Sequence, residues 1–197
     1  MPKLEAVVEG IYELDEFPWP QAKCLAPDYM WVHPAMSDEE IGFVIGQFIT
    51  CEVLHKRLDA RSMLQTILKA DELILRGGLR VIDEKNGLVI NPGCCCGLEN
   101  WNEWLDVPFG KCEIWTGHDP ESLIELNDGK IKIWQDRSLK NEVESIEFTV
   151  DELIKGLKNV KKDLTDFLHR LGQWTKFIKP GLENQVVSHF AKSMNIK

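Results

Sequence analysis

Residues 123–150 read LIELNDGKIKIWQDRSLKNEVESIEFTV, and this stretch decides the fold class. Residues 123–126 and 131–135 predict two strands, joined across Asn127-Asp128-Gly129, whose residue types tolerate the positive φ of a tight turn. Residues 146–150 alternate between apolar and polar side chains and predict a further strand. We therefore expect antiparallel strands in this part of the chain.

A helical tail is predicted after this stretch, over about residues 151–197, with Asp151 as a suitable N-cap. Seven apolar residues recur there at alternating spacings of four and three, which places them on one helical face. They are Leu153, Leu157, Val160, Leu164, Phe167, Leu171 and Trp174. We expect this face to pack on the protein's own core, with a dimer seam as the alternative. A short helix over residues 186–194 is also expected.

The part before residue 123 predicts helices and then strands. Residues 1–36 are expected to be irregular or short-stranded, with a possible strand at 29–32. Ser37 and Glu40 form a capping-box pattern at a helix start, and residues 60–76 predict a helix that Gly77-Gly78 ends. Residues 79–82 and 88–90 predict a hairpin, and residues 112–116 predict a strand.

This order of elements favours one class of fold. Helices flank a run of strands, whereas a doubly wound sheet would require strict alternation of the two. We therefore expect residues 1–197 to form a single α+β domain with a mainly antiparallel sheet flanked by helices.

The charge of the chain is unevenly distributed. Residues 1–150 hold 14 basic and 27 acidic side chains, a net charge of −13, and residues 151–197 hold 9 and 5, a net charge of +4. An acidic surface repels nucleic-acid phosphates and attracts cationic proteins, so we expect no nucleic-acid partner. No apolar run approaches the roughly 20 residues of a membrane span, and the acidic first residues do not resemble a secretion signal. A cytoplasmic protein is expected.

The six cysteines are expected to be free thiols, because a cytoplasmic chain of this length does not need disulfides. Three of them are consecutive, at Cys94, Cys95 and Cys96. A helix beginning near Gly97 could lower the pKa of Cys95 or Cys96 and make that thiol reactive.

The most distinctive stretch runs from Gly93 to Pro120. As an α-helix, residues 98–106 would place Leu98, Trp101 and Leu105 on one face and three acids on another, with Trp104 at the margin and partly exposed. Residues 93–128 hold eight acids against Lys111 alone. We expect an acidic, tryptophan-bearing surface that binds a cationic protein, although Trp104 could instead be an ordinary packing contact. Its candidate partner-binding residues are Glu99, Glu103, Trp104, Asp106, Glu113, Trp115 and Asp119.

Zinc binding is the alternative chemistry, through Cys94, Cys96, Cys112 and His118. Adjacent cysteines on an extended backbone point to opposite faces, so at most Cys94 and Cys96 would act together. Cys51 and His55 have the spacing of one helical turn, which could also hold an ion. The usual paired spacing of a zinc site is absent, so we assign no metal or cofactor.

Catalysis has weaker support than binding. His118-Asp119 could serve a hydrolytic enzyme, but the sequence lacks a phosphate loop, a dinucleotide fingerprint and a nucleophile motif. Asp119 is better suited to capping the backbone of a turn than to catalysis. We expect a protein that is not an enzyme.

A family resemblance agrees with these expectations. The motif Gly-Cys-Cys-Cys-Gly-Leu-Glu-x-Trp at 93–101, the Trp-Thr-Gly-His-Asp-Pro turn at 115–120 and the strands after it resemble a family of uncharacterised bacterial proteins. More distantly, residues 117–171 are similar to the SUKH superfamily, many of whose members are immunity proteins that bind and block toxins. The resemblance implies an acidic α+β binding protein without catalysis. Together with the acidic surface, it leads us to expect a cationic partner, such as a nuclease-like toxin.

Overall fold

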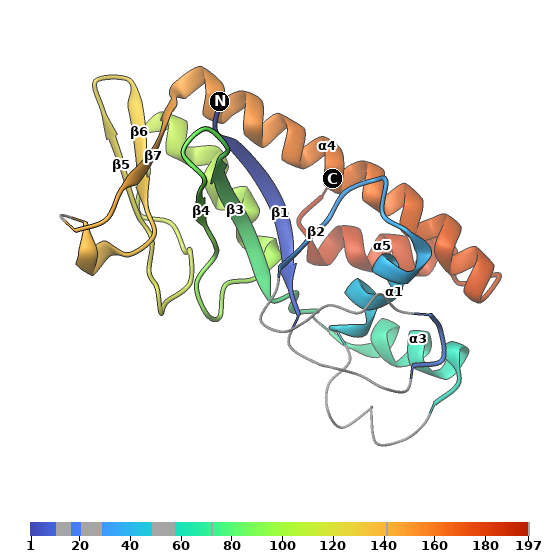
Figure 1. Ribbon diagram of the computed structural model, residues 1–197. Coiled ribbons are helices and arrows are strands. Elements are labelled where there is room, and N and C mark those ends of the chain that lie inside the picture. Colours follow the sequence, from blue (N-terminus) through green and yellow to red (C-terminus); the bar gives the residue numbers. More distant parts are fainter. Residues whose placement is uncertain (11–16, 21–28, 49–57, 72, 141, 197) are drawn as a thin grey trace. The chain divides into compact units, whose positions relative to one another are not determined.

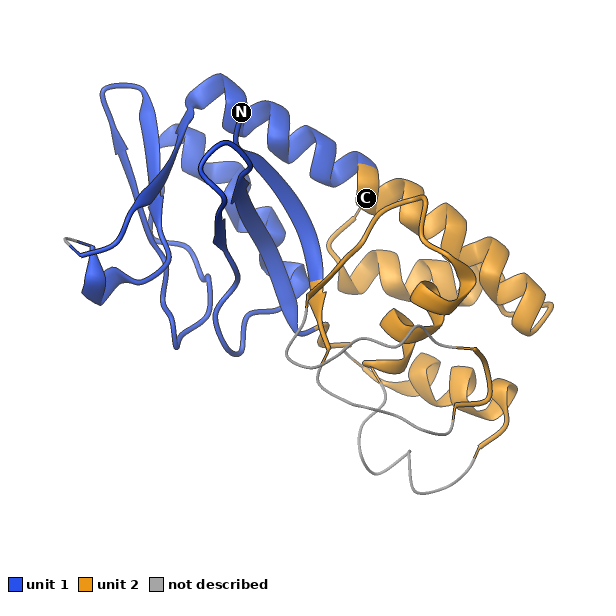
Figure 2. Ribbon diagram, viewed as in Figure 1, with its two compact units in different colours: residues 1–7, 76–162 blue, residues 8–75, 163–197 orange. Residues whose placement is uncertain are grey.

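The computed structural model describes residues 1–10, 17–20, 29–48, 58–71, 73–140 and 142–196 (Figure 1). The chain divides into two compact units (Figure 2). Unit 1 contains residues 1–7 and 76–162, and unit 2 contains residues 8–75 and 163–197. The α+β class with antiparallel strand ladders is confirmed. The expectation that residues 1–197 act as a single domain stays a prediction.

Unit 1 contains the three-stranded sheet that the opening stretch predicts. Its strands are β5 (Leu123–Asn127), β6 (Lys130–Trp134) and β7 (Ser145–Thr149), in that order. Ile131 pairs with Phe148 and Ile133 with Ile146 across the antiparallel β6–β7 ladder, and all four side chains are fully buried. The β5–β6 turn has φ values of 50° at Asp128 and 74° at Gly129, as a tight hairpin requires.

A second sheet has four strands in the order β2-β1-β3-β4. They are β1 (Lys3–Glu9), β2 (Tyr29–Trp31), β3 (Gly77–Asp83) and β4 (Leu88–Ile90). The β3–β4 hairpin and β2 are confirmed, and of the two alternatives for the first residues the irregular one is wrong, because β1 is a regular strand. Its acid Glu5 is only 5% exposed and accepts hydrogen bonds from Arg80, which compensates the buried charge.

The first helices follow their predicted starts but not all their predicted ends. At α1 (Asp38–Gly46), Ser37 and Glu40 make both bonds of the capping box. Helix α3 (Ala60–Lys69) ends well before Gly77, so its predicted extension to residue 76 is wrong. Leu73 and Leu75 are buried while Ile74 between them is exposed, which is the alternation of extended backbone.

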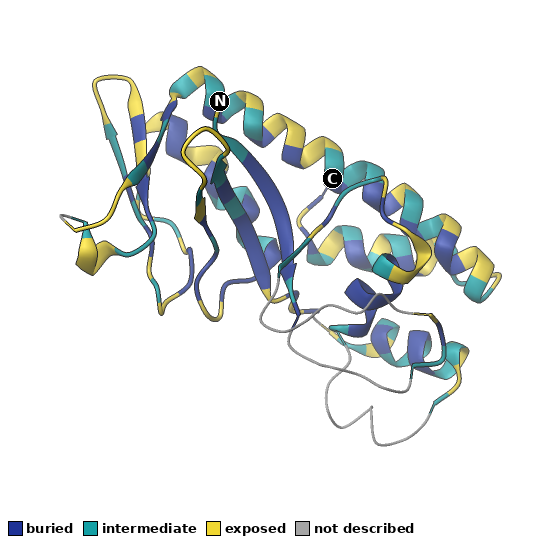
Figure 3. Cartoon of the chain, viewed as in Figure 1, coloured by how far each residue is buried: buried dark blue, intermediate teal, exposed yellow. Residues whose placement is uncertain are grey.

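The long helix α4 (Val150–Ile178) confirms the predicted tail (Figure 3). All seven residues of its apolar stripe are buried within this one chain, so the core-packing interpretation holds over a dimer seam. Thr149, not Asp151, caps the helix: its Oγ1 accepts from Glu152 N–H at 3.2 Å, and Glu152 Oε2 accepts from Thr149 N–H at 2.8 Å. The predicted short helix is α5 (Glu183–Ser193).

Among the helices of the described residues, none combines the length and apolarity that crossing a bilayer would require.

Candidate metal centre

Residues 98–109 form a 3₁₀ helix, η1 (Leu98–Phe109), and not the expected α-helix. A 3₁₀ helix has three residues per turn, so every third side chain lies on the same face. The buried face is therefore Leu98, Trp101, Trp104 and Val107. The predictions for two neighbours are wrong: Trp104 is only 4% exposed, whereas Leu105 is 42% exposed.

Two of the predicted partner-binding acids lie on η1 and make local contacts there. Glu103 Oε1 accepts from Asn100 Nδ2 at 2.9 Å, and Glu103 Oε2 accepts from the backbone N–H of Trp115 at 3.0 Å. Glu99 is half-buried and folds over Gly97, where an added Cβ would lie 2.0 Å from its Oε1. These two carboxylates therefore belong to the local structure of η1.

The exposed predicted acids include two that have basic partners. Asp106 pairs with Lys111 at 3.1 Å, and Glu113 pairs with Arg137 at 3.0 Å. Arg137 lies outside residues 93–128, the stretch that holds eight acids against Lys111 alone. Asp119 is also exposed, on a backbone with φ of 52°. The negative surface is consequently weaker than the local count of charges predicts.

The loop after β4 approaches the 116–120 turn unusually closely. The N–H of Gly93 donates to Thr116 O at 2.8 Å, and the N–H of His118 donates to Cys94 O at 3.0 Å. A Cβ on Gly93 would lie 2.2 Å from Pro120 O, and a Cβ on Gly117 would lie 2.4 Å from Gly93 O. Both glycines are therefore needed for this approach, because any side chain would collide with backbone.

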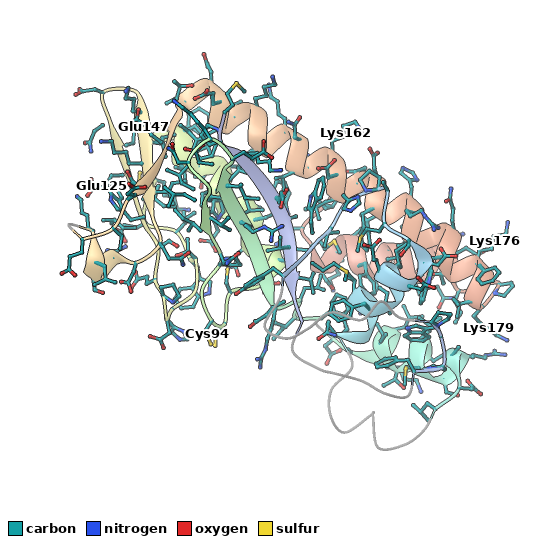
Figure 4. All side chains as sticks on the ribbon, in the orientation of Figure 1. Cys94, Glu125, Glu147, Lys162, Lys176 and Lys179 are labelled. Carbon is teal, nitrogen blue, oxygen red and sulfur yellow. The ribbon has the colours of Figure 1, made fainter. Side chains whose placement is uncertain are left out.

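This approach assembles a cluster of metal-ligand side chains. Ligand atoms of Cys94, Cys95 and His118 all lie within 4.8 Å of one another, and all three residues are exposed. The Cys94 sulfur lies at the end of the loop that follows β4 (Figure 4). Cys95 has φ of 62°, so the expectation that neighbouring cysteines point apart on extended backbone is wrong here.

Trp115 contacts both the cysteine segment and the histidine of the cluster. Its indole Nε1 donates to Cys95 O at 3.2 Å, and its ring meets the His118 ring edge-on at a centroid distance of 5.4 Å. The side chain of Trp115 is 40% exposed, as predicted. Because Glu103 on η1 accepts the hydrogen bond from the Trp115 backbone, Trp115 links η1 to the cluster.

The other predicted zinc ligands do not join the cluster. Cys96 is 4% exposed, and burial, followed by the Glu99 and Glu103 carboxylates, raises its pKa to about 12. Cys112 is half-buried, and burial raises the pKa of its thiol as well. Cys51 and His55 lie outside the described residues. The predicted set of four ligands is thus replaced by a set of three that includes Cys95.

Comparisons of this chain with protein-family models, with curated proteins and with solved structures found no match. The resemblance to SUKH-superfamily proteins therefore stays an expectation from the sequence.

Proposed function

We propose that this chain binds zinc, or another metal ion that accepts thiolate and imidazole ligands, through the thiolates of Cys94 and Cys95 and the imidazole of His118. The observation that carries the proposal is the convergence of these three ligand atoms within 4.8 Å. They come from two segments that backbone hydrogen bonds hold together. Three protein ligands leave one position of a tetrahedral site for water or an external ligand.

The chemistry of the ligands suits this class of ion. Thiolate ligands favour zinc and Cu(I), and imidazole also suits zinc and copper. With Zn–S bonds of about 2.3 Å, two sulfurs of a tetrahedral zinc site lie roughly 3.8 Å apart. The Cys94 and Cys95 sulfurs are 3.3 Å apart, so a small side-chain rotation would admit the ion. Two thiolates would also compensate the charge of a divalent ion.

The proposal includes a cytoplasmic location. Thiols stay reduced there, so Cys94 and Cys95 would remain available as ligands.

The test uses metal-free, reduced full-length protein titrated with Co²⁺ and then with Zn²⁺. We expect one ion per chain and a near-ultraviolet thiolate-to-cobalt absorption that zinc abolishes. Cys94→Ser, Cys95→Ser and His118→Gln should each weaken binding at least as much as the roughly 10–100-fold that loss of an outer-shell partner costs. Cys112→Ser is the matched control, since Cys112 is outside the cluster. Binding that survives in the three ligand variants, or that depends equally on Cys112, would refute the proposal.

A second candidate function is recognition of a cationic protein, such as the toxin that an immunity protein would block. The observation that favours it is the exposed indole of Trp115, in a segment that also carries the exposed acids Glu113 and Asp119. Such an aromatic side chain among carboxylates is suited to anchor a basic partner.

The test of this second function must avoid Glu103, whose removal would disturb the Trp115 backbone. Asp106→Lys with Glu113→Lys should slow association with a cationic, nuclease-like toxin and should reduce the salt dependence of that rate. Trp115→Ala should mainly speed dissociation. An unchanged association rate in the double variant would exclude the electrostatic mechanism.

A further inference from the structure

We propose that Cys94 and Cys95 form a redox pair, in which oxidation joins the two adjacent residues in a disulfide and switches the metal site off. The disulfide itself needs only the two thiols. The release of metal rests on the proposed function, because it assumes an ion held by these two sulfurs and His118.

The geometry of the reduced pair favours this bond. The two Sγ atoms lie 3.3 Å apart, and a disulfide requires about 2.05 Å. The backbone on both sides of the pair is held: Cys94 O accepts from the N–H of His118 at 3.0 Å, and Cys95 O accepts from the Trp115 indole at 3.2 Å. Cys95 has a positive φ, and its sulfur lies beside that of Cys94. Closure therefore needs side-chain rotation more than rearrangement of the loop.

Exposure directs the oxidation to this pair. Cys94 and Cys95 are both exposed, whereas the next residue, Cys96, is 4% exposed and its Sγ faces the carbonyl oxygens of Gly97 and Trp115. Accessible thiols react first with a dissolved oxidant. The third cysteine of the triplet is therefore protected, although it adjoins the pair.

The reaction balances with a peroxide as the oxidant. One thiolate attacks hydrogen peroxide, forms a sulfenic acid and releases one water after proton transfer. The neighbouring thiol then attacks the sulfenic sulfur, and the second water leaves as the S–S bond forms. Two thiols thus lose two electrons and two protons, and one peroxide becomes two waters. The product has neither thiolate available, so His118 alone remains as a protein ligand of the cluster.

The product should be easy to reduce. Neighbouring Cα atoms are 3.80 Å apart across a trans peptide, which is shorter than the roughly 4.4–6.8 Å that disulfides usually span. A disulfide between adjacent residues is consequently strained, and strained disulfides are the labile, regulatory ones. The pair is suited to a reversible switch and not to a permanent crosslink.

The first experiment treats metal-free, reduced full-length protein with stoichiometric hydrogen peroxide and then alkylates the remaining thiols. Before alkylation we expect the intact protein to be lighter by the mass of two hydrogen atoms, and after alkylation we expect peptide mapping to place the bond between Cys94 and Cys95. Cys94→Ser and Cys95→Ser should not lose this mass, and Cys112→Ser should behave as the wild type. A disulfide that requires Cys112, or oxygen adducts in place of the disulfide in the wild type, would overturn the redox pair.

The second experiment applies the same oxidant to the zinc-loaded protein and measures released zinc with a chromogenic chelator. We expect release of one ion per chain, at least tenfold weaker zinc binding after oxidation, and full recovery after treatment with dithiothreitol. Zinc binding without disulfide formation would refute the switch and leave the proposed function intact. Disulfide formation in a protein that never binds zinc would refute the proposed function and its coupling to oxidation, and leave the redox pair.

Discussion

Replacing Trp104 by alanine is expected to destabilise unit 1 by about 3–5 kcal/mol. A tryptophan side chain buries about 150–250 Å², which at about 25 cal/mol per Å² contributes about 4–6 kcal/mol, and alanine keeps a fraction of this. Trp104 is 4% exposed, so nearly the whole contribution applies. Its indole lines a small cavity with Val81, Ile90 and Cys96, and removal of the indole would enlarge that cavity and add to the cost.

Leu105 provides the matched control, because it is the next residue on η1 and is 42% exposed. Leu105→Ala should cost less than about 1 kcal/mol, as is usual for surface substitutions. The assay is urea denaturation followed by far-ultraviolet circular dichroism, which does not depend on the fluorescence of the removed tryptophan. Equal costs for the two variants, or a larger cost at Leu105, would refute the three-residue period of η1.

Three further predictions concern charges and thiols. Glu103→Ala should lower the free energy of unfolding by about 1.5–3 kcal/mol, because it removes two hydrogen bonds to a charged group. Glu113→Ala should lower it by less than about 1 kcal/mol, because it removes only an exposed ion pair. Denaturant melts of both variants check this. Glu5→Met should cost about 3 kcal/mol by leaving Arg80 unpaired, and the double variant with Arg80→Met should recover most of this in the same assay. Burial raises the pKa of the Cys96 thiol to about 12, so its stabilising effect is complete below the unfolded-state pKa and declines as the pH rises toward the folded-state pKa. Between pH 8 and pH 10 metal-free wild type should therefore lose about 1.4 kcal/mol more than Cys96→Ala, and parallel pH dependence would contradict the shift.

The sequence predicts best where neighbouring residues alone determine the structure. The β5–β6 hairpin follows from its Asn-Asp-Gly turn and the alternation around it, and α4 follows from an apolar stripe with helical spacing. The predicted extension of α3 to residue 76 is wrong because Ile74 is exposed while Leu73 and Leu75 on either side of it are buried, which is the alternation of extended backbone and not helical spacing. The exact bounds of strand β1 are not predicted, and the partner of its buried Glu5 is Arg80, 75 residues away, where no local pattern indicates it.

The candidate site shows the same limit. Residues 112–116, expected as a strand, have no regular strand pairing, since Trp115 instead bonds to Glu103 and Cys95 through its two nitrogens. The joining of Cys94 with His118 could be suspected from their residue types. The inclusion of Cys95 depends on a backbone φ of 62°, for which a cysteine gives no local signal.

The close approach at Gly93 and Gly117 has a consequence for any mutational survey of this region. Neither residue has a functional group, yet each occupies a point where two chain segments leave room for a hydrogen atom alone. Substitutions at these glycines would separate the cysteines from the histidine as effectively as deleting a ligand. Loss of metal binding in such a survey would thus identify glycines that keep the two segments close as well as residues that ligate the metal. The glycine variants would differ from the ligand variants in that they retain both thiols and the imidazole.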